Sequence, residues 1–164
     1  MSIPSSNSRL LRRGLAVAGL VAAAMSLGAI SASAGECPAD KIGKNVTPVG
    51  ATAPVGVTDT VLAQIDLAKE SIAAEDRDFR LRRLVIEPGG IVPWHSHEDR
   101  PALIYVVEGE IVEYASTCAV PIVHKAGEVA PETHATAHWW QNLTDKTVVL
   151  LSADILHDES DHNM

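Results

Sequence analysis

Apolar and polar positions alternate in short segments along most of the chain after residue 57. In one segment Val61, Ala63 and Ile65 share a face, and this period of two is typical of a β-strand. Similar short segments follow, separated by turns rich in Gly, Pro and charged residues. Many short strands at this spacing predict an all-β sandwich or barrel. We expect strands at 60–67, 79–86, 102–107, 111–114, 121–124, 138–142 and 147–153, with turns at 87–90, 108–110, 125–128 and 143–146.

The first 34 residues have a different pattern. A start with three arginines and no acidic residue precedes an uncharged stretch rich in Ala, Leu and Val over 15–30 and a small-residue motif over 32–34. This order is typical of a secretory signal peptide, and the apolar stretch is shorter than the roughly 20 residues that span a bilayer. We therefore predict a signal peptide over 1–34 and a periplasmic or secreted mature protein. The pair Arg12 and Arg13 leaves both Sec and twin-arginine export open.

Removal of this segment leaves an extended lead-in at 35–56, a barrel at 57–156 and a flexible acidic tail at 157–164. The whole chain has 13 Lys and Arg against 21 Asp and Glu, a net charge of −8. The predicted signal peptide contains three of the basic residues and no acidic one, so the mature protein has a net charge of −11. Such a surface repels nucleic acid and anionic lipid, which excludes nucleic acid and, after signal cleavage, a membrane as partners.

Both cysteines, Cys37 and Cys118, lie in the exported part, where disulfides are stable. A disulfide would tie the new N-terminus to the barrel. Two free thiols, or a metal role, remain the alternatives, because the sequence does not show whether the two Cα atoms come close enough.

Two of the seven histidines, His95 and His97, stand two residues apart. On a strand these positions face the same side, so two imidazoles can share one metal ion. A third, His138, begins a later predicted strand and could complete a metal site inside a barrel. The alternative is that these are surface or hydrogen-bonded histidines.

The spacing of Gly89, His95, His97 and Gly109 resembles the first motif of the cupin family, and the text Tyr-Val-Val-Glu-Gly-Glu over 105–110 is similar to the cupin strand and turn after the ligands. The second cupin motif is matched by Gly127, His138 and Asn142, whereas Thr133 and Ala135 replace the proline and glycine of its loop.

This resemblance, over roughly residues 79–154, implies a cupin jelly-roll β-barrel, also called a double-stranded β-helix. It implies one divalent metal ion, Fe, Mn, Cu, Ni or Zn, held by His95, His97 and His138. Small cupins commonly pair, so the resemblance also raises a homodimer, which would cover exposed sheet edges.

The sequence departs from the cupin pattern at Ala102, which stands where the family has a carboxylate ligand. The site would then hold three histidines, as in some cupin oxygenases of small molecules. Asp99 and His134 are the two candidates for a replacement fourth ligand.

Three further residues are candidates for binding a small-molecule ligand. The Arg100 guanidinium could hold a carboxylate, and the alternative is a surface Arg paired with Glu98 or Asp99. Trp94 and Trp140 flank the metal ligands in sequence and could line an apolar pocket, and the alternative is core or dimer-interface packing.

Three functions follow from these residues. The first is a metal-dependent dioxygenase or isomerase acting on a small organic molecule, although the motifs contain no obvious general base and the catalytic residues stay unknown. The second is a non-catalytic periplasmic protein that binds a metal or a small ligand. The third is a barrel that has lost its metal.

Overall fold

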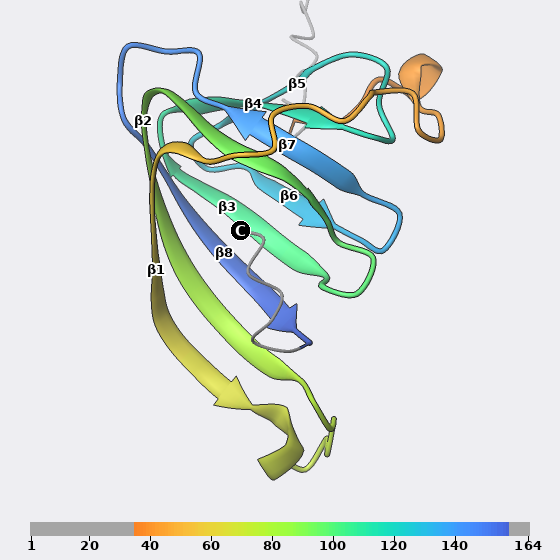
Figure 1. Cartoon of the computed structure of the whole chain (residues 1–164), viewed down its shortest axis with the longest axis vertical. Coiled ribbons are helices and arrows are strands. Elements are labelled where there is room, and N and C mark those ends of the chain that lie inside the picture. The colour runs from red at the N-terminus through yellow and green to blue at the C-terminus, as the bar shows by residue number, and fades with distance from the viewer. Residues whose placement is uncertain (1–34, 158–164) are drawn as a thin grey trace, which may run out of the picture. The chain divides into compact units, whose positions relative to one another are not determined.

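In the computed structural model, which describes residues 35–157, eight strands form one continuous antiparallel sheet that curls into a barrel (Figure 1). The strands are ordered β5-β4-β7-β2-β8-β3-β6, and β1 pairs with β2. The prediction of an all-β jelly-roll barrel is therefore confirmed. The strands are β1 (Val55–Asp66), β2 (Asp78–Ser96), β3 (Ala102–Glu108), β4 (Glu110–Ala115), β5 (Ile122–Lys125), β6 (Val129–Glu132), β7 (Ala137–Gln141) and β8 (Val148–Leu156).

Between residues 35 and 157 the helices are two short 3-10 turns, η1 (Ala39–Lys41) and η2 (Leu67–Lys69). Among the residues that the structure describes, no helix has the length and apolar character needed to cross a bilayer. The predicted signal peptide at 1–34 and residues 158–164 of the predicted tail lie outside the described part of the chain.

The long strand β2 belongs to both halves of the barrel. Its first part pairs with β1 and β8, and its last part, residues 91–96, pairs with β7. The prediction of a turn at 87–90 is wrong. Strand β2 bends at these residues but does not reverse, and it continues as one strand to Ser96. Gly89 has a φ of 76°, which a glycine adopts at little cost, and its N–H still donates to the Asn142 carbonyl at 2.9 Å.

Strand β1 begins earlier than its sequence pattern predicts and contains a bulge. The register with β2 shifts between Val61 and Ala63. A bulge adds one residue to a strand and reverses which side chains face inward beyond it. Val61 and Ala63 therefore lie on opposite faces of the strand, not on the one face that their alternation predicts.

Strand β6 was missed by the sequence analysis because Pro131 interrupts its pattern. A proline cannot donate a hydrogen bond to a neighbouring strand, so it is tolerated on a sheet edge. In the sheet order β6 is the last strand and pairs with β3, where Pro131 lies opposite Leu103. This strand matters for the site because it also carries Glu132.

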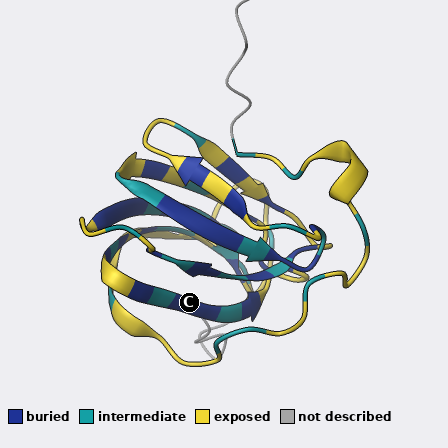
Figure 2. Cartoon of the chain, turned by 90° about the horizontal axis from the view of Figure 1, so that it is seen from above, coloured by how far each residue is buried: buried dark blue, intermediate teal, exposed yellow. Residues whose placement is uncertain are grey.

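The barrel interior has an apolar and a polar zone. Buried and exposed positions alternate along most strands, as a curved sheet with one enclosed face requires (Figure 2). The apolar zone consists of Leu84, Ile86, Val92, Val106, Ile111, Ala130, Trp140, Val148 and Leu150. The polar zone includes the buried residues Arg82, His95, His97, Arg100, Glu113, His124, Glu132, His138, Ser152 and Asp154.

The lead-in before β1 is fastened to the barrel by a disulfide between Cys37 and Cys118, whose Cα atoms are 5.7 Å apart. A β-bridge between Ile42 and Cys118 holds the same contact through the backbone. Of the alternatives that the sequence left open for the cysteines, the structure contains the disulfide.

Asn142 fixes the corner where β2 bends. Its side chain is fully buried, and its Nδ2 donates to the carbonyls of Ile86 at 3.1 Å, Glu87 at 3.0 Å and Lys146 at 2.7 Å. Its Oδ1 accepts from the backbone N–H of Thr144 at 3.0 Å. One amide thus joins the bend in β2 to the turn between β7 and β8.

We expect Asn142→Ala to lower the free energy of unfolding by about 2–4 kcal/mol, because it leaves buried carbonyls without donors. Urea unfolding followed by circular dichroism measures this change. Gln64→Ala is the matched control, since the Gln64 amide makes one exposed hydrogen bond, to Asp78. Equal stability of the two variants would contradict the role of Asn142.

Candidate metal centre

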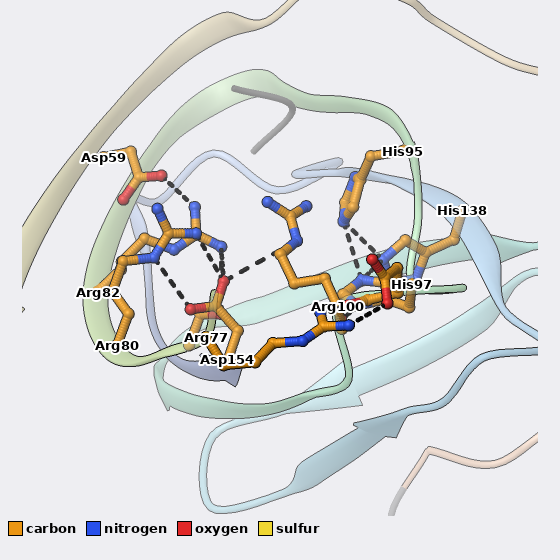
Figure 3. Close-up of polar contacts among 11 residues, drawn as sticks. Asp59, Arg77, Arg80, Arg82, His95, His97, Arg100, His138 and Asp154 are labelled. Atoms are coloured by element: carbon orange, nitrogen blue, oxygen red, sulfur yellow. Dashed lines mark hydrogen bonds and ion pairs between the residues drawn. The ribbon is translucent and has the colours of Figure 1, made fainter. Parts of the chain in front are cut away.

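Three histidines converge inside the barrel from two neighbouring strands. His95 on β2 lies directly opposite His138 on β7, and His97 follows just after the end of β2. The three Nε2 atoms form a triangle in which every side is 3.0 Å. All three residues are buried (Figure 3).

Each imidazole is oriented by a bond to its other nitrogen. Nδ1 of His95 lies 2.9 Å from the Pro93 carbonyl, and Nδ1 of His97 lies 2.7 Å from the Arg100 carbonyl. Nδ1 of His138 lies 2.7 Å from Oε1 of Glu113. Because these oxygens act as acceptors, each Nδ1 would carry its proton when a metal is bound, and each Nε2 would then direct a lone pair into the triangle.

The triangle fits a divalent transition metal. Three lone pairs pointing at one another repel unless a cation lies between them. Imidazole nitrogens bind such metals at about 2.0–2.1 Å, so two ligands at a right angle are about 3.0 Å apart. The observed separation matches that value, and the ordering of Nδ1 by oxygen acceptors is usual for metal-binding histidines.

Two of the histidines are held neutral by their surroundings. Burial, together with the charges of the nearby His138 and Arg100, lowers the pKa of His97 to about 3. Burial, together with His138 and His97, also lowers the pKa of His95 well below its usual value. Neutral imidazoles are the form that binds a metal.

Glu113 on β4 supports His138 from behind. Its Oε1 accepts from His138, and its Oε2 lies 2.8 Å from Nε2 of His124. Burial opposes ionisation, but the two histidine contacts outweigh it and lower the pKa of Glu113 to about 2. The pKa of His138 is raised because the Glu132 and Glu113 carboxylates outweigh its burial. Glu113 is therefore an ionised carboxylate on the side of His138 that faces away from the Nε2 triangle.

His124 on the edge strand β5 is buried inside the barrel. Its ring stacks on Trp140 with centroids 4.7 Å apart. Trp140 belongs to the apolar zone and is 2% exposed, and its Nε1 lies 3.0 Å from Nδ1 of His138. The indole thus packs in the apolar zone beside His138, which is the core packing that the sequence left open as the alternative.

Glu132 on β6 is a second buried carboxylate beside His138. Its Oε1 lies 3.6 Å from Nδ1 of His138, and together with Glu113 these residues form a group whose ligand atoms lie within 4.8 Å of one another. The pKa of Glu132 is raised to about 7, because burial and the neighbouring Glu113 carboxylate outweigh the opposing positive charge of His138.

A network of arginines and aspartates fills the other side of the polar zone. Asp154 accepts two hydrogen bonds from Arg80, at 3.0 and 2.8 Å, and one from Arg82 at 3.1 Å. Arg82 also donates to Asp59. Figure 3 shows Arg100 between this network and the histidines, and its Nε is 4.0 Å from Asp154.

Arg100 is 1% exposed, so the alternative of a surface arginine paired with Glu98 or Asp99 is wrong. The loop after His97 returns the chain into the barrel, and the side chain points inward. It is therefore placed to contact a molecule near the histidines.

The two candidates for a fourth ligand do not join the histidines. Asp99 is exposed, and its carboxylate pairs with Arg77 at 2.6 Å and with His157. His134 is exposed and lines open surface depressions. Both lie in loops that face outward. Trp94 is half-buried and precedes the inward-facing His95, so the alternation of β2 places it on the other face.

Three buried acidic residues, Glu113, Glu132 and Asp154, were not predicted as part of the site from the sequence. A signal existed for Glu113, because it stands two residues after the apolar Ile111 on a predicted strand and therefore shares its buried face. Asp154 likewise continues the buried phase of Leu150. Glu132 gave no such signal, because its strand was not predicted.

Comparison with known proteins agrees with this architecture. A model of the Cupin_2 family, described as a cupin domain, matches residues 82–154. None of the curated proteins matches the sequence.

Several solved structures have a similar fold. A cupin 2 conserved barrel protein from Salinispora arenicola is 16% identical, with a TM-score of 0.46, over 60% of this chain and 74% of its own. A protein with a double-stranded β-helix domain from Klebsiella pneumoniae is 16% identical, with a TM-score of 0.49, over 70% of this chain and 85% of its own. Oxalate decarboxylase is 18% identical, with a TM-score of 0.47, over 64% of this chain and 26% of its own.

The family match covers strands β2 to β8, which contain all three converging histidines. The residues from 82 to 154 thus carry a cupin-2-like domain.

Proposed function

We propose that the mature protein is an exported, metal-dependent cupin that acts on a small organic molecule as an oxygenase. The observation that supports this most strongly is the triangle of Nε2 lone pairs, each side 3.0 Å, in a buried position. A divalent metal held by three neutral imidazoles would supply a Lewis acid with positions left for other ligands. Export rests on the sequence of residues 1–34.

Residues of the chain would orient the ligands of that metal, exclude water and bind the substrate. The backbone carbonyls at Pro93 and Arg100 orient two ligands, and Glu113 orients the third and offsets positive charge. The surrounding strands exclude water. Arg100 would hold an anionic group of the substrate beside the histidines, because a guanidinium binds a carboxylate through two hydrogen bonds. A small carboxylic acid is therefore the substrate class that this interior favours.

A non-catalytic binding protein is the second candidate. It is favoured by the fact that Asp154 and Glu113 are already occupied in ion pairs, which leaves few groups for proton transfer. Such a protein needs the metal and the anion site, and no turnover.

We expect His95→Ala combined with His97→Ala to reduce bound metal from about one ion per chain to near zero, because one imidazole does not hold a divalent metal tightly. Elemental mass spectrometry of untagged protein measures this. His157→Ala removes an exposed histidine and is the control. Full metal content in the double variant, with a folded barrel by circular dichroism, would disprove the site.

We expect Glu113→Gln to weaken metal binding about 10–100-fold, because the amide keeps a hydrogen-bond acceptor but loses the charge behind His138. Competition with a chromophoric chelator gives the affinity. Glu110→Gln, on the same strand with a solvent-exposed carboxylate paired to Lys125, is the control. An unchanged affinity would show that Glu113 has only a packing role.

Oxygen consumption separates the enzyme from the binding protein. Protein loaded with Fe(II) without oxygen is mixed with a set of small aliphatic and aromatic carboxylic acids, and oxygen uptake is recorded. An oxygenase consumes oxygen with at least one acid, and the His95→Ala, His97→Ala protein does not. Thermal stabilisation by an acid without any oxygen uptake would favour the binding protein.

A further inference from the structure

The position that lacks the carboxylate ligand has two acidic neighbours across the sheet. Ala102 on β3 faces inward and is 6% exposed. It lies opposite Asp154 on β8 and opposite Glu132 on β6. Residues directly opposite on one face of a sheet have Cβ atoms about 4.5–5.5 Å apart. Both acidic side chains therefore begin one strand away from position 102.

Only one of these two carboxylates is available. Asp154 is fixed by two hydrogen bonds from Arg80 and one from Arg82. Glu132 is 4% exposed, and its carboxylate accepts no hydrogen bond from the other residues between 35 and 157. Its one ion-pair contact in that range is with His138, at 3.6 Å. A buried carboxylate with so little compensation is costly unless a cation completes its surroundings.

Glu113, the third buried carboxylate, cannot take this role. Its two oxygens are each held by a histidine, at 2.7 and 2.8 Å. If Oε1 moved to the metal, Nδ1 of His138 would lose the acceptor that orients this imidazole with its Nε2 toward the triangle. If Oε2 moved, His124 would lose its only carboxylate partner among the described residues.

We propose that Glu132 provides, from β6, the carboxylate ligand that the barrel lacks at position 102. This rests on the proposed metal function. In the structure the Glu132 carboxylate lies 3.6 Å from Nδ1 of His138, outside the Nε2 triangle, and it would turn about its side-chain bonds to reach a metal there. The ligand has thus moved to the neighbouring strand, and the metal charge is still partly neutralised.

The test uses the mature protein and Co(II), whose visible absorption reports the ligands. We expect Glu132→Gln to weaken Co(II) binding at least about tenfold and to change the absorption spectrum. Returning the carboxylate to β3, with Ala102→Glu and Glu132→Ala together, should restore affinity and spectrum, whereas Glu132→Ala alone should not. Glu98→Gln, next to His97 but exposed, is the control for charge alone.

The outcomes separate this proposal from the metal function itself. If the unaltered protein binds no Co(II), the metal function fails. If it binds Co(II) and Glu132→Gln binds it equally well, only the role of Glu132 fails. Weaker binding with an unchanged spectrum would also overturn the proposal, because Glu132 would then act through the charge on His138 and not as a ligand.

Discussion

The bend of β2 at residues 87–90 is the constraint on which the metal centre depends. Before the bend the strand pairs with β8, and after it the strand pairs with β7. Antiparallel pairing with β7 places His95 opposite His138, and a shift of one residue would turn His138 out of the barrel. Gly89 makes the bend accessible, and the Asn142 amide fastens it to the turn before β8. The β2–β7 register that brings His95 and His138 together thus depends on Gly89 and Asn142, which are not part of the histidine site.

The interior of this barrel contains many charged side chains. Burying an unpaired charge is strongly unfavourable, so such groups occur in pairs or beside a cation. Asp154 follows this rule through Arg80 and Arg82, and Glu113 follows it through His124 and His138. Glu132 has only a 3.6 Å contact with His138, and the Nε2 atoms of the three histidines face one another on the other side of that ring. Their shared need for positive charge is the physical reason to place a metal there.

Local pattern predicted most of the strands but not how they are interrupted. The period of two located five of the later strands, β3, β4, β5, β7 and β8, to within a few residues, and it found the beginning of β2. It failed at the β1 bulge, because one inserted residue reverses the faces and nothing in residues 61–63 marks it. It failed at β6, because Pro131 is unfavourable in a central strand and only the sheet order shows that β6 is an edge.

The sequence by itself determined that this chain is a β-barrel with three histidines at the spacing of a shared site, because strand period and motif spacing are local properties. It did not determine which acidic residues join them. Glu113, Glu132 and Asp154 are 16 to 57 residues from the first histidine pair along the chain, and only strand pairing brings them together. For the same reason the sequence placed Asp99 and His134 near the ligands, whereas their loops turn outward. Residues that are close in sequence can point in different directions after a turn, and the register of strand pairing decides which distant residues lie opposite each other.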